Sequence, residues 1–246
     1  MFFPFFKKKK KEKRRGPILS VDVHSHLIPN IDDGSQSLEE SLVLLHGFEA
    51  LGYEKLIITP HIMSDSYPNS ATTILNGLDA LRQEAEKNGI ALVLEAGAEY
   101  YLDEHFFEEM QQEKVMSIAN RYVLFESSYI SKPLQIEEMI FAIGEAGYEP
   151  MMAHPERYRY IRDPEKEYRR FKDLGVHFQV NINSFGGHYG KQAEGLANFL
   201  SEAGMIDFLG SDVHHRKQID TLSELFYSDV YHKVCENNNI KNDRLL

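Results

Sequence analysis

The stretch "ILSVDVHSH" at residues 18–26, followed by "SLEESLVLLHGFEALG" at residues 37–52, decides the fold class. The first segment is a short run rich in Ile, Leu and Val, as in a buried strand, and the second has apolar residues at helical spacing. Short apolar runs and longer segments of helical period then alternate along the rest of the chain. We therefore predict seven strand–helix units that build a parallel sheet covered by helices, either open and doubly wound or closed as a barrel.

The boundaries of these units follow from the same pattern. The predicted strands lie within residues 18–26, 55–61, 91–100, 122–128, 149–158, 177–185 and 207–214. The predicted helices lie within residues 37–52, 71–89, 102–112, 134–147, 163–175, 191–204 and 218–236. Glycines that stand just past a predicted helix, where a left-handed C-terminal cap is favoured, are Gly52, Gly89, Gly147, Gly175 and Gly204.

Composition limits the classes of protein that the chain can belong to. Its 246 residues, 42% of them hydrophobic, are enough for a substantial core. A formal net charge of −11 argues against nucleic acid as the main partner. The single Cys235 excludes an internal disulfide and fits a reducing compartment, and no window approaches the roughly 18 apolar residues of a membrane span. We predict a cytoplasmic protein.

The N-terminal segment differs from the rest of the chain. Residues 7–15, "KKKKKEKRR", carry eight of the 27 basic residues and one of the 38 acidic residues. No apolar segment follows the basic run, so it is a poor secretory signal. Two interpretations are open: a disordered solvated arm, or a peripheral anchor on anionic lipid at the inner face of the membrane. We divide the chain into a basic tail at residues 1–16 and a single domain at residues 17–246.

Chemically active residues stand at the C-terminal ends of the predicted strands. They are His24, His26, His61, Glu99, His154, Arg157, Asp212 and His214. In a parallel barrel these ends converge on one face, so the side chains are expected to meet in one pocket. Histidines and carboxylates without a thiolate indicate Mn²⁺, Fe²⁺ or Zn²⁺, and their number exceeds the three protein ligands of one catalytic zinc. Taken alone, His61 or His154 is equally well explained as a core histidine.

Five segments together resemble a known family. In order they are "DVHSHLIPNIDDGSQSLEES", "TPH", "GAEYYLD", "AHPERY" and "GSDVH". They are similar to the motifs of the polymerase-and-histidinol-phosphatase (PHP) superfamily, and most similar to the manganese-dependent protein-tyrosine phosphatases of bacterial capsule and exopolysaccharide operons. The specific part is the D-D-G after H-S-H, together with H-P-E-R-Y. The resemblance implies a distorted (β/α)₇ TIM-like barrel with two or three ions, Mn²⁺ first and Fe or Zn as alternatives.

The resemblance also implies roles for individual residues. It assigns a first metal cluster to His24, His26, Glu99 and Asp212. Glu99 would bridge to a metal held by His61 and His154, and Asp33 and His214 would serve a third metal. Asp32 is an alternative to Asp33, since either residue can simply close the turn before Gly34.

The implied chemistry is hydrolysis of a phosphate monoester, among the slowest uncatalysed reactions. Metals lower the pKa of bound water, and Arg157 would neutralise the phosphate oxygens through a bidentate contact; its alternative is an ion pair with Glu156 or Asp163. Arg216 is a second candidate clamp. A tyrosine leaving group has a pKa of about 10, and Asp33 or His214 would lend it a proton. The implied substrate is the phosphorylated tyrosine cluster of a membrane-bound bacterial tyrosine kinase.

Other functions fit the sequence less well. A cysteine-dependent tyrosine phosphatase needs Arg six residues after its Cys, but Lys241 stands there after Cys235. A metal amidohydrolase commonly uses a carbamylated lysine, and the predicted strand ends carry none. A histidinol-phosphate phosphatase or other small-phosphoester hydrolase of the same fold stays open. So does a non-catalytic scaffold with relic metal motifs.

Overall fold

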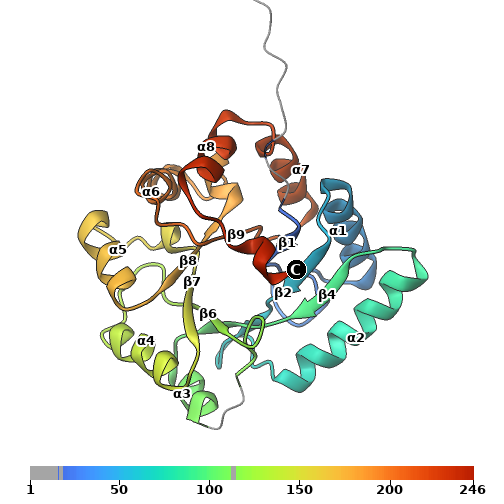
Figure 1. Cartoon of the computed structure of the whole chain (residues 1–246). Coiled ribbons are helices and arrows are strands. Elements are labelled where there is room, and N and C mark those ends of the chain that lie inside the picture. The colour runs from blue at the N-terminus through green and yellow to red at the C-terminus, as the bar shows by residue number, and fades with distance from the viewer. Residues whose placement is uncertain (1–15, 17–18, 112–114) are drawn as a thin grey trace, which may run out of the picture.

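The computed structural model describes Gly16, residues 19–111 and residues 115–246, and it arranges the strands as a ring with the helices outside (Figure 1). The basic segment predicted at residues 1–15 lies outside the described residues. Gly16 is buried, and its N–H donates to the carbonyl of Phe226 at 2.6 Å.

All pairings between the described strands are parallel. The strands are β1 (Val21–Asp22), β2 (Lys55–Ile58), β3 (His61–Ile62), β4 (Val93–Ala96), β5 (Glu99–Tyr101), β6 (Tyr122–Glu126), β7 (Glu149–Ala153), β8 (His177–Asn181) and β9 (Phe208–Gly210). They form sheets of order β1-β2-β4 and β3-β5-β6-β7-β8-β9. The second and third predicted strands are thus each interrupted, as β2 and β3 around Pro60 and as β4 and β5 around Gly97.

The two sheets form one closed barrel. The N–H of Gly97 donates to the carbonyl of Ile58 at 3.0 Å, so the ladder continues across the interruption. At the other seam Ser25 pairs in parallel with Val213, and the N–H of His26 donates to the Val213 carbonyl at 3.0 Å. If β2 with β3 and β4 with β5 are each counted as one interrupted strand, the barrel has seven parallel strands, which confirms the prediction.

The helices follow the predicted segments, with one exception. They are α1 (Leu38–Leu51), α2 (Ala71–Lys87), α3 (Glu104–Gln111), α4 (Ile136–Glu145), α5 (Pro164–Asp173), α6 (Lys191–Glu202), α7 (Arg216–Leu225) and α8 (Asp229–Asn237). The single helix predicted at residues 218–236 is wrong, because α7 and α8 are separate. Ser228 starts α8, since its side chain accepts a hydrogen bond from the N–H of Tyr231 at 3.1 Å. The five glycines predicted as caps have φ between 66° and 91°, which confirms their role.

Alternation along the strands separates two layers of core. In β6, Tyr122 and Leu124 belong to an inner cluster, while Val123 and Phe125 pack with the helices in an outer one. The inner cluster consists of Val21, Val23, Ile57, Ile118, Tyr122, Leu124, Met151, Ala153 and Phe208. These side chains fill the barrel, so it is a packed core and only its ends can carry a site.

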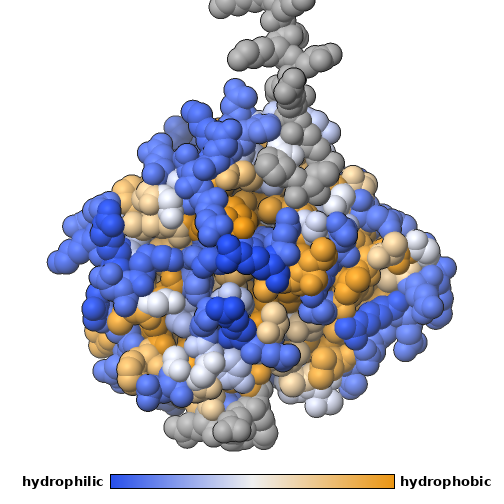
Figure 2. Space-filling model, viewed as in Figure 1, coloured by the Kyte–Doolittle hydropathy of each residue, from blue (hydrophilic) through white to orange (hydrophobic). Residues whose placement is uncertain are grey.

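A short 3₁₀ segment, η3 (Asn242–Leu245), covers the N-terminal end of the barrel. Asn242 is buried and donates to the carbonyls of Val21 at 2.9 Å and Leu209 at 2.7 Å. Figure 1 looks onto this end, with the C-terminus over the ring. Figure 2 shows hydrophilic residues both at the edge and in the middle of this face, with hydrophobic residues between them. The strand ends that carry the predicted ligands therefore open on the opposite side. Among the described helices, none is both long and apolar enough to cross a membrane.

Candidate metal centre

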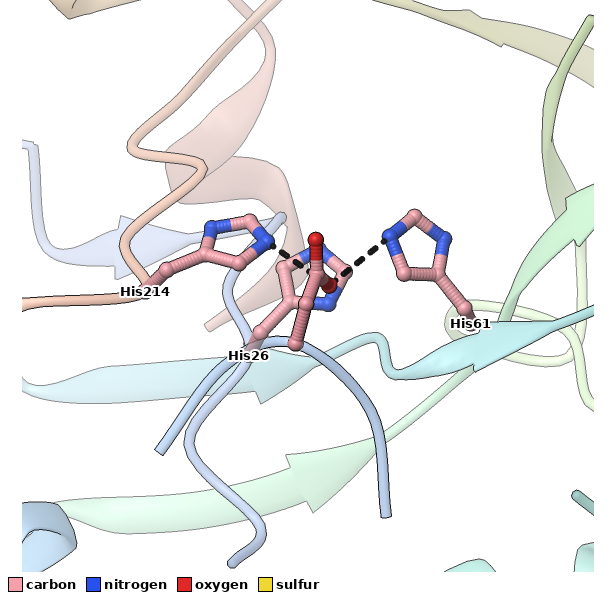
Figure 3. A group of neighbouring side chains, drawn as sticks. His26, His61 and His214 are labelled. Atoms are coloured by element: carbon pink, nitrogen blue, oxygen red, sulfur yellow. Dashed lines mark ion pairs between the residues drawn. The ribbon is translucent and has the colours of Figure 1, made fainter. Parts of the chain in front are cut away.

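All eight predicted metal ligands meet at the C-terminal end of the barrel. They form overlapping groups whose ligand atoms lie within 4.8 Å of one another. The groups are His26, Asp33, His61 and His214; His24, Glu99 and His154; His24, His26 and Asp212; and His61, Glu99 and Glu126. Figure 3 shows His26, His61 and His214 turned toward one another, and its dashed lines mark the ion pairs of His61 and His214 with Asp33.

His24 and His26 point the same way, as the H-S-H spacing predicts. Their Nε2 atoms lie 3.2 Å apart, and Glu99 Oε2 is 3.2 Å from the first and 3.4 Å from the second. Asp212 Oδ1 lies 3.6 Å and 3.7 Å from the same two nitrogens. Four ligand atoms of the predicted first cluster therefore surround one point.

Glu99 is shared between neighbouring groups. Its Oε1 lies 2.8 Å from His154 Nε2, and its Oε2 lies 3.1 Å from His61 Nδ1. Glu126 completes this side, with Oε1 at 3.3 Å from His61 Nδ1. Sequence reasoning missed Glu126, although it ends the run "YVLFE" in the same way that Glu99 ends a strand-like run.

The two adjacent aspartates, Asp32 and Asp33, occupy different positions relative to the cluster. Asp33 Oδ1 lies 3.4 Å from His61 Nε2 and 3.4 Å from His214 Nε2, and half of its side chain is exposed. Asp32 is buried instead and lies behind His26, whose Nδ1 is 2.8 Å from Asp32 Oδ2. Asp33 therefore faces the other predicted ligands at the mouth, and Asp32 holds the His26 ring from behind.

Three histidines have their Nδ1 atoms fixed from outside the cluster. The Nδ1 of His24 donates to Gln179 Oε1 at 2.6 Å, that of His26 donates to Asp32, and that of His214 donates to a backbone carbonyl at 3.0 Å. An Nδ1–H places the lone pair of a neutral imidazole on Nε2. All three lone pairs then face the inside of the cluster, which is the arrangement of metal-binding histidines.

The buried carboxylates of the cluster favour positive charge on the groups around them. Burial lowers the pKa of His24 and His61, but the carboxylates around them, Glu99 foremost, raise these values to about 9 and about 10. Burial and the charge of Glu99 raise the pKa of Glu126 to about 7. Without metal ions the carboxylates hold protons on His24 and His61, whereas burial and the charge of Arg157 lower the pKa of His154 to about 4. A divalent cation would take the place of the protons on His24 and His61.

The residues present fit a divalent metal centre. His61 Nδ1 is buried and has no hydrogen-bond partner, although Glu99 Oε2 is 3.1 Å away. Ligand atoms at about 2.1 Å from one ion lie roughly 3 Å from each other, so this spacing suits two ligands better than a donor and an acceptor. The donor set of imidazoles and carboxylates is the one that Mn²⁺, Fe²⁺ and Zn²⁺ accept.

Two ligand residues adopt a backbone conformation that is uncommon outside glycine. His154 has φ of 33° and Asp212 has φ of 50°, both in the left-handed region. His154 directly follows β7, and Asp212 lies two residues after the end of β9. Both turns bring their side chains into the cluster, which is the kind of place where such backbone strain is found.

Arg157 touches the cluster through Asp212. Its Nη1 donates to Asp212 Oδ2 at 2.9 Å, and the same oxygen accepts from Asn181 Nδ2 at 2.6 Å and from the Tyr189 hydroxyl at 2.9 Å. The guanidinium carbon lies 4.6 Å from the ring centre of Tyr129 and 4.4 Å from that of Tyr189. Held between two rings, the guanidinium has a fixed plane. Its partner is therefore neither Glu156 nor Asp163.

The chain is similar over most of its length to a known family of proteins. A family model described as capsular polysaccharide synthesis, CpsB/CapC, matches residues 20–237. The chain belongs to the CpsB/CapC family. The resemblance seen in the motifs is thereby confirmed.

Relatives of this CpsB/CapC chain are tyrosine-protein phosphatases. YwqE of Bacillus subtilis is 28% identical over 226 residues, which cover 88% of this chain and 89% of YwqE. CpsB of Streptococcus pneumoniae is 28% identical over 202 residues, covering 79% and 83% of the two chains. A chain from the crystal structures of these two proteins, described as unique metal-dependent tyrosine phosphatases, superposes with a TM-score of 0.76. It is 26% identical and covers 89% of this chain and 96% of its own.

Arg216 lies apart from these contacts. It is the first residue of α7, its side chain is 58% exposed, and its Nε pairs with Asp220 at 3.3 Å. In this CpsB/CapC chain Arg157 therefore lies beside the cluster, in contact with Asp212, whereas Arg216 lies on the exposed surface of α7.

Gln179 gives a first test of the centre. We expect Gln179→Leu, which keeps the side-chain volume but removes the acceptor for His24 Nδ1, to weaken metal binding by roughly 10-fold, at the lower end for such orienting groups. Competition with a chelator measures the affinity. Gln83→Leu, on the exposed face of α2, is the control and keeps wild-type affinity. Equal affinity in both variants would show that His24 needs no fixed tautomer.

Proposed function

We propose that this chain is a metal-dependent protein-tyrosine phosphatase of capsular or exopolysaccharide synthesis. The observation that carries the proposal is the Asp212 carboxylate, which faces three histidines through Oδ1 and Arg157 through Oδ2. A phosphate-binding group therefore sits directly beside a centre suited to divalent ions. The family membership and the phosphatase relatives support the same conclusion.

The ions that we propose are two or three Mn²⁺, with Fe or Zn as alternatives. His24, His26, Glu99 and Asp212 would hold one ion, and Glu99 would share a second with His61, His154 and Glu126. Asp33 and His214 would serve a third. When bound, such ions lower the pKa of water and neutralise the charge that develops on phosphate oxygens.

The chain's own side chains supply the rest of the chemistry. Arg157 is charged at every working pH, and its planar fork binds two phosphate oxygens at once. Tyr129 and Tyr189 hold that fork in one plane, so the phosphate is bound in one orientation. Asp33 and His214 lie at the mouth of the cluster, where His214 can deliver a proton to the leaving phenol oxygen when it holds no metal. Asp33 is the weaker candidate, because its contacts with His214 and His61 lower the pKa of its carboxyl and keep it ionised. A phenol, with a pKa of about 10, needs less of this help than an alkyl alcohol does.

An assay with single metals tests the proposal. The protein is stripped with a chelator, reloaded with Mn²⁺, Fe²⁺ or Zn²⁺, and offered phosphotyrosyl peptide, phosphoseryl peptide and histidinol phosphate. We expect Mn²⁺ to restore the highest activity and phosphotyrosine to be the best substrate. Faster turnover of histidinol phosphate would assign a small-phosphoester phosphatase instead. No turnover with any metal would leave the scaffold role.

We further propose that the physiological substrate is a phosphorylated, membrane-bound bacterial tyrosine kinase, and that the enzyme works at the cytoplasmic face of the membrane. The basis is charge: outside residues 7–15 the chain holds 19 basic and 37 acidic residues, so that segment is the strongly cationic part. A polybasic segment gains roughly 1 kcal/mol per basic residue near an anionic surface.

Deletion of residues 1–15 tests this role of the tail. We expect the truncated protein to hydrolyse p-nitrophenyl phosphate normally but to stop sedimenting with vesicles of anionic lipid at low salt. Raised salt should release the full-length protein, because it screens the attraction. If both proteins ignore the vesicles alike, the tail is only a solvated arm.

A further inference from the structure

A second recess opens beside the Arg157 contact. It has a volume of about 380 Å³, and its lining includes Tyr129, Ile130, Arg157, Arg159, Tyr189 and Gln192. This volume lies in the lower part of the range for pockets that hold drug-sized ligands, so it suits a short peptide segment. Because Arg157 belongs to the lining, this recess is continuous with the place where a substrate phosphate would contact Arg157, and the flanking peptide can lie along it.

Arg159 lines the recess, and within the described ranges its guanidinium has no bonding partner. Its side chain is exposed, and it makes no ion pair or side-chain hydrogen bond with the residues that the structure describes. Six other arginines in the described ranges pair with carboxylates: Arg82, Arg121, Arg157, Arg169, Arg170 and Arg216. In a chain with 38 acidic and 27 basic residues, an arginine left unpaired at a recess is available to an external anion.

The backbone around Arg159 fixes its position. Its N–H donates to the carbonyl of Tyr129 at 2.7 Å, which ties the segment after Arg157 to the loop that carries Ile130. Ile130 is 73% exposed and offers an apolar contact beside the cation. Across the recess α6 begins at Lys191, and its N-cap Gly190 has no side chain to bind the first N–H groups, which adds positive potential. Glu156 also lines the recess, but it is almost fully buried and its Oε1 already accepts from Ser184 and from the Asn181 N–H.

We infer that this recess is the subsite for the peptide that flanks the phosphotyrosine, and that Arg159 binds an anionic group on that peptide. The inference rests on the proposed phosphatase function. The anion is a carboxylate or a second phosphate, since both match the guanidinium fork. The enzyme then prefers phosphotyrosine in an acidic or multiply phosphorylated segment over the same residue in a neutral segment.

Three matched peptides and two variants test the inference. Each peptide carries one cleavable phosphotyrosine, flanked by Glu, by a non-hydrolysable phosphonate analogue of phosphotyrosine or by Gln, and kcat/KM is measured for each with the Mn²⁺-loaded enzyme. We expect the wild type to prefer an anionic flank by roughly 5-fold, the upper end for an exposed ion pair, mainly through KM, and to lose the preference in high salt. The larger of the two anionic ratios identifies the preferred anion.

Arg159→Gln should bring the ratio of anionic to neutral peptides close to one. This ratio is taken within one protein, so it does not depend on how much of the variant is folded. Arg162→Gln is the matched control, because Arg162 is also exposed and without a carboxylate partner in the described ranges, but does not line the recess. It should keep the wild-type ratio. An unchanged ratio in Arg159→Gln, or an equal loss in Arg162→Gln, would overturn the subsite. Failure of every peptide with every metal would overturn the phosphatase function itself.

Discussion

Glu99→Ala is expected to lose metal and activity together. Its two oxygens lie within 3.4 Å of nitrogens from four histidines, so the substitution removes a ligand from more than one group at once. We expect kcat/KM to fall by on the order of 10³-fold or more, beyond the 10- to 100-fold typical of groups that only orient a ligand. Metal content measured on the purified variant should fall in parallel, while circular dichroism stays that of the wild type.

Glu95→Ala is the control for this loss. Glu95 lies in β4, four residues earlier, and pairs with Lys55 at 2.8 Å on the opposite side from the cluster groups. Lys55 is buried but keeps its hydrogen bond to the Leu245 carbonyl at 2.7 Å in this variant, and Glu95 belongs to none of the ligand groups, so metal content and turnover should be unchanged. Full metal occupancy and normal turnover in Glu99→Ala would rule out a centre in which ions share this carboxylate.

Arg157→Lys is expected to keep the metals and lose the reaction. Lysine carries the charge but lacks the planar fork, and it cannot stack between Tyr129 and Tyr189 in the same way. We expect activity to fall by roughly 10²-fold, the scale of one lost electrostatic stabiliser. Steady-state kinetics on phosphotyrosyl peptide and metal analysis of the same sample measure the two effects separately.

Arg216→Lys separates the two candidate clamps. Its guanidinium pairs with Asp220 on the surface of α7, so the substitution should change the rate by less than about twofold. A normal rate in Arg157→Lys combined with a large loss in Arg216→Lys would move the phosphate clamp to the start of α7.

The fold was predictable because each strand–helix unit carries its own local signals. Apolar runs mark the strands, and Gly52 or Gly147 marks a helix end by needing positive φ. The break between α7 and α8 was missed because Phe226, Val230 and Val234 follow one another at a helical spacing of four residues across it. Only the hydrogen bond from the Tyr231 N–H to Ser228 shows that a new helix begins.

The site residues were predictable where a side chain stands at the C-terminal end of a strand. They were not predictable where a side chain contacts a histidine from outside the cluster, as Asp32 and Gln179 do. Nothing in "IDDG" tells Asp32 from Asp33, since the difference is the direction in which the turn points each carboxylate. Gln179 interrupts an apolar strand, which is a weak signal for a buried polar contact. Tyr129 and Tyr189 lie in loops far apart in sequence, and only the closed barrel brings both rings against Arg157.

The left-handed backbone at His154 and Asp212 bears on how this lineage has evolved. Each such conformation in a non-glycine residue costs on the order of 1–3 kcal/mol, and selection retains that cost only while the side chain is needed there. A descendant that kept the barrel merely as a scaffold would gain stability by drifting to glycine or to a relaxed turn at either position. The residue type at these two turns therefore gives a way to sort members of the family: chains with His and Asp there are expected to keep the chemistry, and chains with glycine there are expected to have lost it.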